Sequence, residues 1–363
     1  MNDVRITRVM TNLKARGLMQ IFICDPMSIK WLTGYYTLPF ERFFGLLLAA
    51  DKEPVMFCNR LFLDASGACT NVILFDDTDD PIPLLADQCL HDQALGIDKE
   101  LAAKWLLPLM HSGAAQDYLL ASDAVDGARS IKDTAEQQAM RAASATNDKA
   151  MAWLRSQVKA GVTEFSIAER LLAEYRRLGA QDHSFEPIVS FGANAADPHH
   201  EPDNTVLQDG QIVLFDVGCK QDDYCSDMTR TFWFAGEKNI EPDDLSYRVY
   251  ETVRQANEAA EAIVRPGVSF AEIDKAARDV IAAQGWGEYF THRLGHQIGL
   301  VDHEPGDVSS THDEPVQVGQ VFSIEPGVYI PGKVGVRIED LLIVTEDGCE
   351  ILNSYPKEFT ILH

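Results

Sequence analysis

Four carboxylate side chains stand in apolar, β-forming runs in the second half of this chain. Asp216 follows Ile-Val-Leu-Phe, Asp227 precedes Met-Thr-Arg-Thr-Phe-Trp-Phe, and a polar turn at residues 220–223 separates the two runs. This pattern predicts a hairpin with one carboxylate in each strand. Aspartate is disfavoured inside strands, and burying its charge is costly unless a cation offsets it. For one aspartate alone, a solvent-facing position on an edge strand is the better explanation.

Glu325 and Glu339 repeat this pattern, and a turn at residues 331–332 predicts a second hairpin between them. A glycine-rich segment before them contains three of the ten histidines within twelve positions: His292, His296 and His303. A lone histidine is usually a packing or surface residue. Three histidines in one such segment favour a functional site.

Four carboxylates and one histidine together predict a shared cation site. Carboxylates can bridge two cations and imidazole adds a borderline ligand, so the set suits Mn²⁺, Co²⁺, Fe²⁺ or Zn²⁺. Two such ions about 3.5–4 Å apart can activate a bridging water and stabilise the oxyanion that forms at a carbonyl. The seven cysteines show no structural zinc spacing and are interpreted as free thiols in a reducing compartment.

The net charge limits the expected partners. Lys and Arg number 31 against 56 Asp and Glu, which gives a formal charge of −25. Such a surface repels nucleic acid and anionic membranes, so neither is expected as a partner. The N-terminal segment carries charges and no apolar signal region, and the longest apolar stretch, residues 43–50, cannot span a bilayer. A cytoplasmic protein is expected.

The length of 363 residues suits two domains, which we expect at residues 1–125 and 126–363. The first domain has helical spacing at residues 5–16 and 101–110. Its short apolar runs, bounded by turn residues, predict an α/β domain with a mixed sheet: residues 18–24, 43–50, 54–58, 72–75, 95–98 and 118–121.

The second domain begins with a long helical pattern at residues 134–158 and contains a weak internal repeat. Residues 160–178 and 266–284 each carry Gly-Val at their second and third positions, followed by a Ser-x-x-Glu capping box at Ser166/Glu169 and Ser269/Glu272. A duplicated helix–helix–strand unit explains this most simply. Two generic amphipathic helices are the alternative.

These motifs, together with Phe-Gly-Ala-Asn-Ala-Ala-Asp-Pro-His-His at residues 191–200, resemble the pita-bread metallopeptidases, especially bacterial Xaa-Pro dipeptidases (prolidases). The likeness covers nearly all of the second domain, and the first domain resembles the creatinase-type domain of the same family. It implies an α+β protein in which an N-terminal α/β creatinase-like domain precedes a pita-bread catalytic domain.

The resemblance implies two divalent metal ions per subunit, with Mn²⁺ expected first and Co²⁺ or Zn²⁺ as alternatives. Asp216 would bind one ion, and Asp227 and Glu339 would bridge both. His296 and Glu325 would bind the other ion. Glu325 would also shuttle a proton for the attacking water.

The same resemblance implies further roles around the metals. His199 would stabilise the tetrahedral intermediate or the departing amine, and His303 would be a second active-site histidine. His292 would line the substrate pocket, and Arg337 and Tyr329 would either orient ligands or contact substrate.

One position departs from the family pattern. The family usually reads Gly-His-Gly-Ile-Gly where this chain has Gln297 after His296. We expect the longer side chain either to narrow the pocket or to alter the metal preference.

The expected activity is that of a metallo-dipeptidase that hydrolyses Xaa-Pro dipeptides, with the bridging water attacking the scissile carbonyl. An Xaa-Pro bond has no N–H, so a specialist must supply a proton to the leaving nitrogen, from His199 or His303. Arg293 is the candidate for binding the free carboxylate of the dipeptide.

Three alternatives share this fold, and a fourth belongs to another class. An aminopeptidase P acting on longer peptides is the main one. Creatinase-type hydrolysis needs no metal set, and the N-terminal domain disfavours methionine aminopeptidase. A non-catalytic binding module would have little reason to retain all five ligands. We also expect a homodimer in which the aromatic loop at residues 33–44 limits substrate length.

Overall fold

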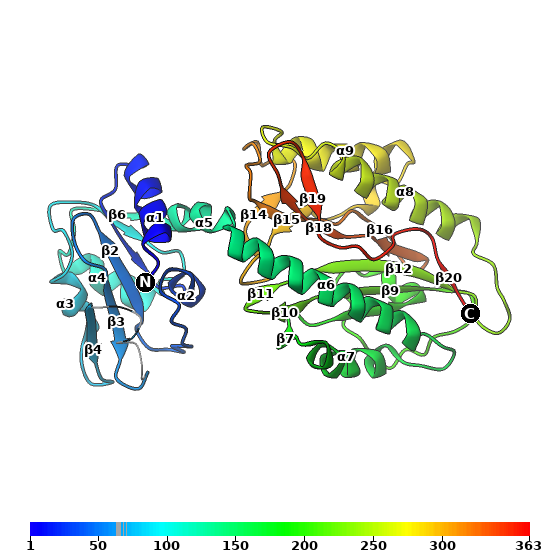
Figure 1. The fold of residues 1–363 in the computed structure, drawn as a ribbon, viewed down its shortest axis with the longest axis horizontal. Coiled ribbons are helices and arrows are strands. Elements are labelled where there is room, and N and C mark those ends of the chain that lie inside the picture. Colours follow the sequence, from blue (N-terminus) through cyan, green and yellow to red (C-terminus); the bar gives the residue numbers. More distant parts are fainter. Residues whose placement is uncertain (63–66, 68, 70) are drawn as a thin grey trace. The chain divides into compact units, whose positions relative to one another are not determined.

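The computed structural model describes residues 1–62, 67, 69 and 71–363. The chain forms two compact units, Met1–Arg129 and Ser130–His363 (Figure 1). The position expected for the domain boundary, near residue 125, falls within helix α5 (Ser122–Ser130). Each unit has an apolar core of its own.

The first unit is built on a mixed sheet with strand order β4-β3-β2-β1-β5-β6. β1 pairs antiparallel with β2 and parallel with β5, so the predicted mixed sheet is confirmed. Each of the six predicted runs supplies one strand: β1 (Gln20–Ile23), β2 (Gly45–Ala49), β3 (Val55–Asn59), β4 (Asn71–Phe75), β5 (Leu95–Ile97) and β6 (Tyr118–Leu120).

Helices pack around this sheet for reasons visible in the sequence. The Asp25 carboxylate accepts two backbone N–H groups of the first turn of α2, and Gly34, at φ 79°, ends that helix. Trp105 of α4 meets the ring of Phe43 edge-on at 5.4 Å, which fixes α4 against the core. The remaining helix bounds are α1 (Asp3–Ala15), α2 (Pro26–Thr33), α3 (Pro81–Ala86) and α4 (Ala103–His111).

The second unit contains the predicted duplication of paired helices: α6 (Thr134–Gln157) with α7 (Glu164–Leu178), and α8 (Asp244–Glu261) with α9 (Phe270–Ala283). The capping box predicted for α9, Ser269 with Glu272, is confirmed. The box predicted for α7 is wrong by one turn. Thr163 caps that helix with Ser166 as its partner, because the helix begins at Glu164, before the expected cap.

Between and after these helices, the described strands form a four-stranded sheet (β20-β12-β9-β8), a five-stranded sheet (β14-β13-β15-β18-β19), a three-stranded sheet (β11-β10-β7) and a hairpin (β16-β17). Their bounds are β7 (Asp182–His183), β8 (Ile188–Phe191), β9 (Gln211–Val217), β10 (Cys219–Gln221), β11 (Tyr224–Cys225), β12 (Met228–Phe234), β13 (Gly295–Gln297), β14 (Glu304–Val308), β15 (Val321–Ile324), β16 (Gly327–Ile330), β17 (Val334–Arg337), β18 (Asp340–Val344), β19 (Cys349–Ile351) and β20 (Ile361–Leu362). Two short 3-10 helices, η2 (Gly192–Ala196) and η3 (Gly287–Tyr289), complete the unit.

Strand β9 is covered on both faces, which explains its nearly continuous apolar run. Val213 and Phe215 pack in the core that includes α6 and α7, whereas Ile212 and Leu214 pack in the core that includes α8 and α9. Because side chains alternate along a strand, Asp216 lies on the face of Ile212 and Leu214. That face leads to the candidate site.

Candidate metal centre

A cavity of about 480 Å³ in the second unit gathers the predicted site residues from both halves of the repeat. Tyr329 is buried and joins the site through hydrogen bonds to other side chains. The predicted residues that line the cavity itself are His199, Asp216, Asp227, His292, Arg293, His296, His303, Glu325, Arg337 and Glu339.

The carboxylates reach this cavity mainly from breaks between strands. The prediction of a carboxylate inside each strand is right for Asp216, which lies in β9. It is wrong for the other three: Asp227 directly precedes β12, Glu325 lies between β15 and β16, and Glu339 lies between β17 and β18. At a break the backbone leaves the strand ladder, so a side chain can turn towards the cavity without following the pleat.

Three of these side chains converge tightly. One ligand atom from each of Asp227, His296 and Glu339 lies within 4.8 Å of the other two. The His296 Nε2 atom lies 3.6 Å from Asp227 Oδ2 and 3.5 Å from Glu325 Oε1. Ligand atoms at roughly 2.0–2.2 Å from one shared ion lie about 3–3.5 Å apart, so this spacing fits a common cation.

Two carboxylate oxygens in the cluster support the same conclusion. Asp216 Oδ1 and Asp227 Oδ1 are buried, and within the described part of the chain neither accepts a hydrogen bond. A buried acceptor without a donor is costly in a folded protein. A divalent cation would use these lone pairs, and oxygen with imidazole ligands is a donor set that such cations take.

Neighbouring side chains hold the carboxylates in place. Thr229 Oγ1 donates to Glu339 Oε2 at 2.8 Å, and Ser323 Oγ donates to Glu325 Oε1 at 3.2 Å. We did not predict either hydroxyl from the sequence. Ser323 stands two residues before Glu325, the spacing that puts two side chains on one strand face, and this was the available signal.

Burial and mutual repulsion shift the acid–base behaviour of the cluster. Burial, and then the charge of Glu339, raises the pKa of Asp227 well above its usual value. Burial likewise raises the pKa of Glu339 strongly, and raises that of Glu325 to about 7. Burial, with the nearby His303, lowers the pKa of His296 to about 3. Without cations, Asp227, Glu325 and Glu339 therefore tend to hold protons, while His296 remains a neutral donor of its lone pair.

Two further histidines face the cluster from the rim. His199 is exposed and follows the 3-10 helix η2. The ring of His303 lies 4.0 Å from that of His296, and its Nδ1 is 3.2 Å from Asp302 Oδ2. The hydrogen bond to Asp302 raises the pKa of His303. Asp302 also lines the cavity, and sequence reasoning missed it.

A chain of hydrogen bonds links the cluster to its buried surroundings. Arg337 donates to Asp216 Oδ2, to Thr229 Oγ1 at 3.1 Å and to the Tyr329 hydroxyl at 2.7 Å. Tyr329 in turn lies 2.9 Å from His292 Nε2. Because its guanidinium nitrogens already serve protein acceptors, Arg337 is suited to orienting Asp216.

Arg293 and Gln297 take different places. Arg293 is partly exposed, lines the cavity and pairs with Asp307. Gln297 is buried and, among the described residues, does not line the cavity. The Gln297 side chain packs against Gly306, because a Cβ added to Gly306 would lie only 2.5 Å from Gln297 Nε2. The expected narrowing of the pocket is therefore wrong, because strand alternation turns Gln297 away from the face of His296.

A second group of possible ligands lies elsewhere in the same unit and comprises Glu164, His200 and Asp203. Both oxygens of its central carboxylate, that of Glu164, already have hydrogen-bond partners within the protein. Glu164 Oε1 accepts from the Phe191 N–H at 2.6 Å and from Asn194 at 3.0 Å, and Glu164 Oε2 lies 2.7 Å from His200 Nε2. This group holds together the loop that carries His199.

The model of metallopeptidase family M24 matches residues 138–346, and the creatinase/prolidase N-terminal domain matches residues 5–131. The chain belongs to metallopeptidase family M24. It is therefore a hydrolase of a family that uses divalent metals, and the expected fold class, a creatinase-type domain followed by a pita-bread domain, is confirmed.

Individual proteins resemble the whole chain. An uncharacterized peptidase from Staphylococcus epidermidis is 36% identical over 93% of this chain and 95% of its own length. A dipeptidase from Mycobacterium ulcerans has a TM-score of 0.92 at 33% identity, over 99% of this chain and 97% of the other. A prolidase from Thermococcus sibiricus has a TM-score of 0.91 at 31% identity, over 100% and 99%.

Among the helices that the structure describes, none is both long enough and apolar enough to span a bilayer.

Proposed function

We propose that this metallopeptidase hydrolyses Xaa-Pro dipeptides using two divalent ions held by Asp216, Asp227, His296, Glu325 and Glu339. The observation that carries the proposal is the convergence of these side chains on one cavity. Two of the buried carboxylate oxygens there receive no hydrogen bond from any residue that the structure describes. Similar structures are named as a dipeptidase and a prolidase, which supports the substrate class.

The charge balance supports two ions. With cations bound, the four ligand carboxylates would be ionised. The buried guanidinium beside them is Arg337, since Arg293 is partly exposed and pairs with Asp307, and His296 is neutral because burial lowers its pKa to about 3. A single divalent ion would leave an excess negative charge in a buried site, which is costly. Two ions compensate for the cluster, and the carboxylates can bridge them.

The chain's own side chains would carry out the proton transfers of the reaction. Bound divalent ions supply the Lewis acidity that polarises the scissile carbonyl and activates the attacking water. Glu325, which lines the cavity and accepts a hydrogen bond from Ser323, would accept a proton from that water and pass it on. His303, whose pKa is raised by Asp302, is suited to protonating the departing proline nitrogen, with His199 at the same rim.

Substrate recognition would use the walls of the cavity. Phe185, Ile188 and Pro198 line it and offer an apolar surface for a proline ring. Arg293 would pair with the free carboxylate of a dipeptide, in competition with Asp307. We expect Arg293→Ala to raise KM for Xaa-Pro while changing little for a carboxyl-amidated substrate. Equal losses on both substrates would refute this role.

The direct test compares Ala-Pro with Ala-Pro-Ala after the protein has been stripped with a chelator and reloaded with Mn²⁺, Co²⁺ or Zn²⁺. We expect no hydrolysis by stripped protein, restored cleavage of Ala-Pro, and the highest rate with Mn²⁺. Comparable cleavage of Ala-Pro-Ala would replace the dipeptidase by an aminopeptidase P. No hydrolysis with any of the three ions would contradict both activities.

A homodimer in the cytoplasm completes the proposal. The loop at residues 33–44 exposes Tyr36, Leu38 and Phe40, the last at 78%. Such a cluster is suited to a subunit contact. We expect sedimentation to show a dimer, and Phe40→Ser to relax the limit on substrate length. A fully active monomer would contradict this part, and secretion of the native protein would contradict the location.

A further inference from the structure

Buried side chains outside the cavity hold the backbone beside the metal-site carboxylates, and the first example is Asn147 of α6. Its Nδ2 donates to the carbonyl of Val217 at 2.8 Å, next to Asp216. Its Oδ1 accepts from the Tyr175 hydroxyl at 2.7 Å. Asn147 has no exposed surface. The Asn147 amide is thus fixed through both its nitrogen and its oxygen, and it holds the end of β9 in place.

The other half of the repeat has an equivalent. Asn257 of α8 is also fully buried, and its Nδ2 donates to the carbonyl of Ile324 at 2.9 Å, directly before Glu325. Its Oδ1 accepts from Lys357 Nζ at 2.7 Å. In each half, an asparagine from the long first helix therefore holds a strand end that carries a carboxylate.

The remaining two carboxylates are held in the same manner. Asn353 Nδ2 donates to the carbonyl of Asp227 at 3.1 Å. Arg230, which is 1% exposed, donates to the carbonyl of Glu339 at 2.7 Å. The N–H of Glu339 also donates to the carbonyl of Thr229 at 3.2 Å. Glu339 is therefore fixed through its N–H, its carbonyl and its side chain.

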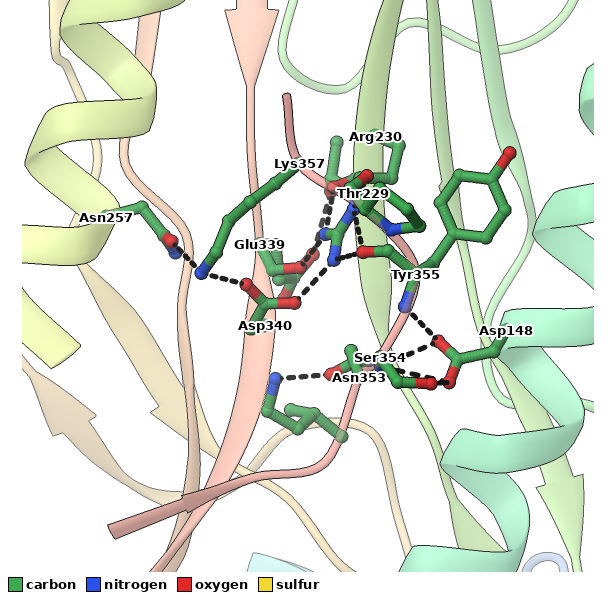
Figure 2. Close-up of polar contacts among 12 residues, drawn as sticks. Asp148, Thr229, Arg230, Asn257, Glu339, Asp340, Asn353, Ser354, Tyr355 and Lys357 are labelled. Carbon is green, nitrogen blue, oxygen red and sulfur yellow. Dashed lines mark hydrogen bonds and ion pairs between the residues drawn. The ribbon is translucent and has the colours of Figure 1, made fainter. Parts of the chain in front are cut away.

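These donors are themselves oriented by a polar network, which Figure 2 shows around Asp340. Arg230 donates to Asp340 Oδ1 at 2.6 Å, and Lys357 donates to Asp340 Oδ2 at 2.7 Å. Lys357 also reaches Asn257. The backbone before Glu325 and the backbone of Glu339 are thus joined through one set of hydrogen bonds, and none of these four side chains lines the cavity.

We propose that Asn147, Asn257, Asn353 and Arg230 are positioning residues that set the spacing of the four carboxylates for divalent ions. The proposal rests on the proposed metal site. Its physical basis is that three of the carboxylates lie in strand breaks, where the ladder does not fix the backbone. A shift of about 1 Å in a ligand would spoil a shared cation site.

A purely structural role would also satisfy these buried carbonyls, so the test must separate folding from metal affinity. The key variant is Asn257→Ala, because Lys357 keeps Glu261 and Asp340 as partners. The matched control is Trp233→Phe. It removes a partly buried N–H to carbonyl bond in the same unit, from Trp233 Nε1 to Ile240 at 2.8 Å, away from the carboxylates.

The experiment titrates chelator-stripped protein with Co²⁺, followed by its visible absorption, alongside thermal unfolding of the stripped form. We expect Asn257→Ala to bind Co²⁺ about 10-fold more weakly, with a lower kcat and little change in KM, while Trp233→Phe loses stability alone. Equal Co²⁺ affinity in wild type and Asn257→Ala would overturn the proposal. If the wild type binds no Co²⁺, the proposed metal site itself fails, which is a separate result.

Asn257→Ala could prevent folding, so Tyr175→Phe provides a milder variant. It keeps the ring and removes only the hydroxyl that orients Asn147. We expect about 3-fold weaker Co²⁺ binding, below the usual 10–100-fold loss because no donor to the strand is deleted. Unchanged Co²⁺ affinity in folded Tyr175→Phe would contradict the role of Asn147.

Discussion

Two groups of acidic and imidazole side chains in the catalytic unit look alike in composition but differ in what surrounds them. Asp227, His296 and Glu339 form one, and Glu164, His200 and Asp203 form the other. In the first, Asp227 Oδ1 is buried without a hydrogen bond from any described residue. In the second, both oxygens of Glu164 already have protein partners.

The electrostatics follow the same division. Burial and the neighbouring Glu339 raise the pKa of Asp227, whereas the hydrogen bonds from Thr205 lower that of Asp203. Protein donors stabilise the charged form of a carboxylate, and crowded carboxylates without donors destabilise it. Ligand-like residues therefore identify a metal site only when their lone pairs remain free and their charges remain uncompensated.

The largest expected effect comes from replacing Asp227 in the first group, with the same replacement of Asp203 in the second group as the control. Asp227→Asn should remove a bridging ligand and lower kcat/KM by about 1,000-fold, or about 4 kcal/mol of transition-state stabilisation. Asp203→Asn, the matched control, should bind metal as the wild type does. Dipeptide hydrolysis and metal content of both variants provide the measurement. Loss of bound metal in Asp203→Asn would reverse the distinction between the groups.

A smaller effect is expected in the pH dependence of the metal-free protein. Burial raises the pKa of Glu325 from 4.5 in an open chain to about 7 in the folded protein. The folded state then holds the proton more tightly, so this stabilisation is complete below pH 4.5 and is lost as the pH rises through 7. The difference is roughly 3 kcal/mol in the free energy of unfolding.

Urea unfolding of stripped protein between pH 4.5 and 7 measures this effect, with Glu325→Gln as the control that lacks it. Metal-loaded protein should show the opposite trend, because ions bind the deprotonated ligands. If the free energy of unfolding of metal-free protein rose with pH by a similar amount in wild type and in Glu325→Gln, burial would not be destabilising the charged form of Glu325, and this prediction would be wrong.

The smallest expected effect concerns Gln297, which has a buried oxygen without a donor in the described part of the chain but stands outside both groups. Its Oε1 is also buried without a hydrogen bond from any described residue, but the Gln297 side chain packs by Gly306 and does not line the metal cavity. Gln297→Gly should keep kcat/KM within about 2-fold and lower the free energy of unfolding by about 1 kcal/mol. A 10-fold change in the ratio of Mn²⁺- to Co²⁺-supported activity would place Gln297 in the metal site after all.

Much of the fold could be predicted because it depends on local patterns. The six apolar runs of the first unit, the helix from Thr134 and the cap at Ser269 all follow from periodicity and capping chemistry. The carboxylates were identified because charge in apolar β-rich segments needs compensation. Their number and neighbours made the resemblance to a family specific.

The remaining features depend on contacts between distant segments. Glu325 and Glu339 were expected within strands, but the strands break at both residues. Pro326 and Gly327 are a local signal for the first break, whereas no local pattern marks the break at Glu339. Thr229, Asn257 and Arg230 look like ordinary helix or strand residues until the fold brings them beside carboxylate-bearing segments. Pairing across a fold cannot be read from the spacing of residues along the chain.

The most direct test of the metal site is its stoichiometry. Protein stripped with a chelator would be titrated calorimetrically with Mn²⁺, in parallel with Asp227→Asn and Asp203→Asn. We predict about two ions per chain for the wild type and for Asp203→Asn, and loss of binding in Asp227→Asn. Binding that survives in Asp227→Asn but disappears in Asp203→Asn, or a wild type that binds no Mn²⁺, would contradict the assignment of the cavity cluster as the metal centre.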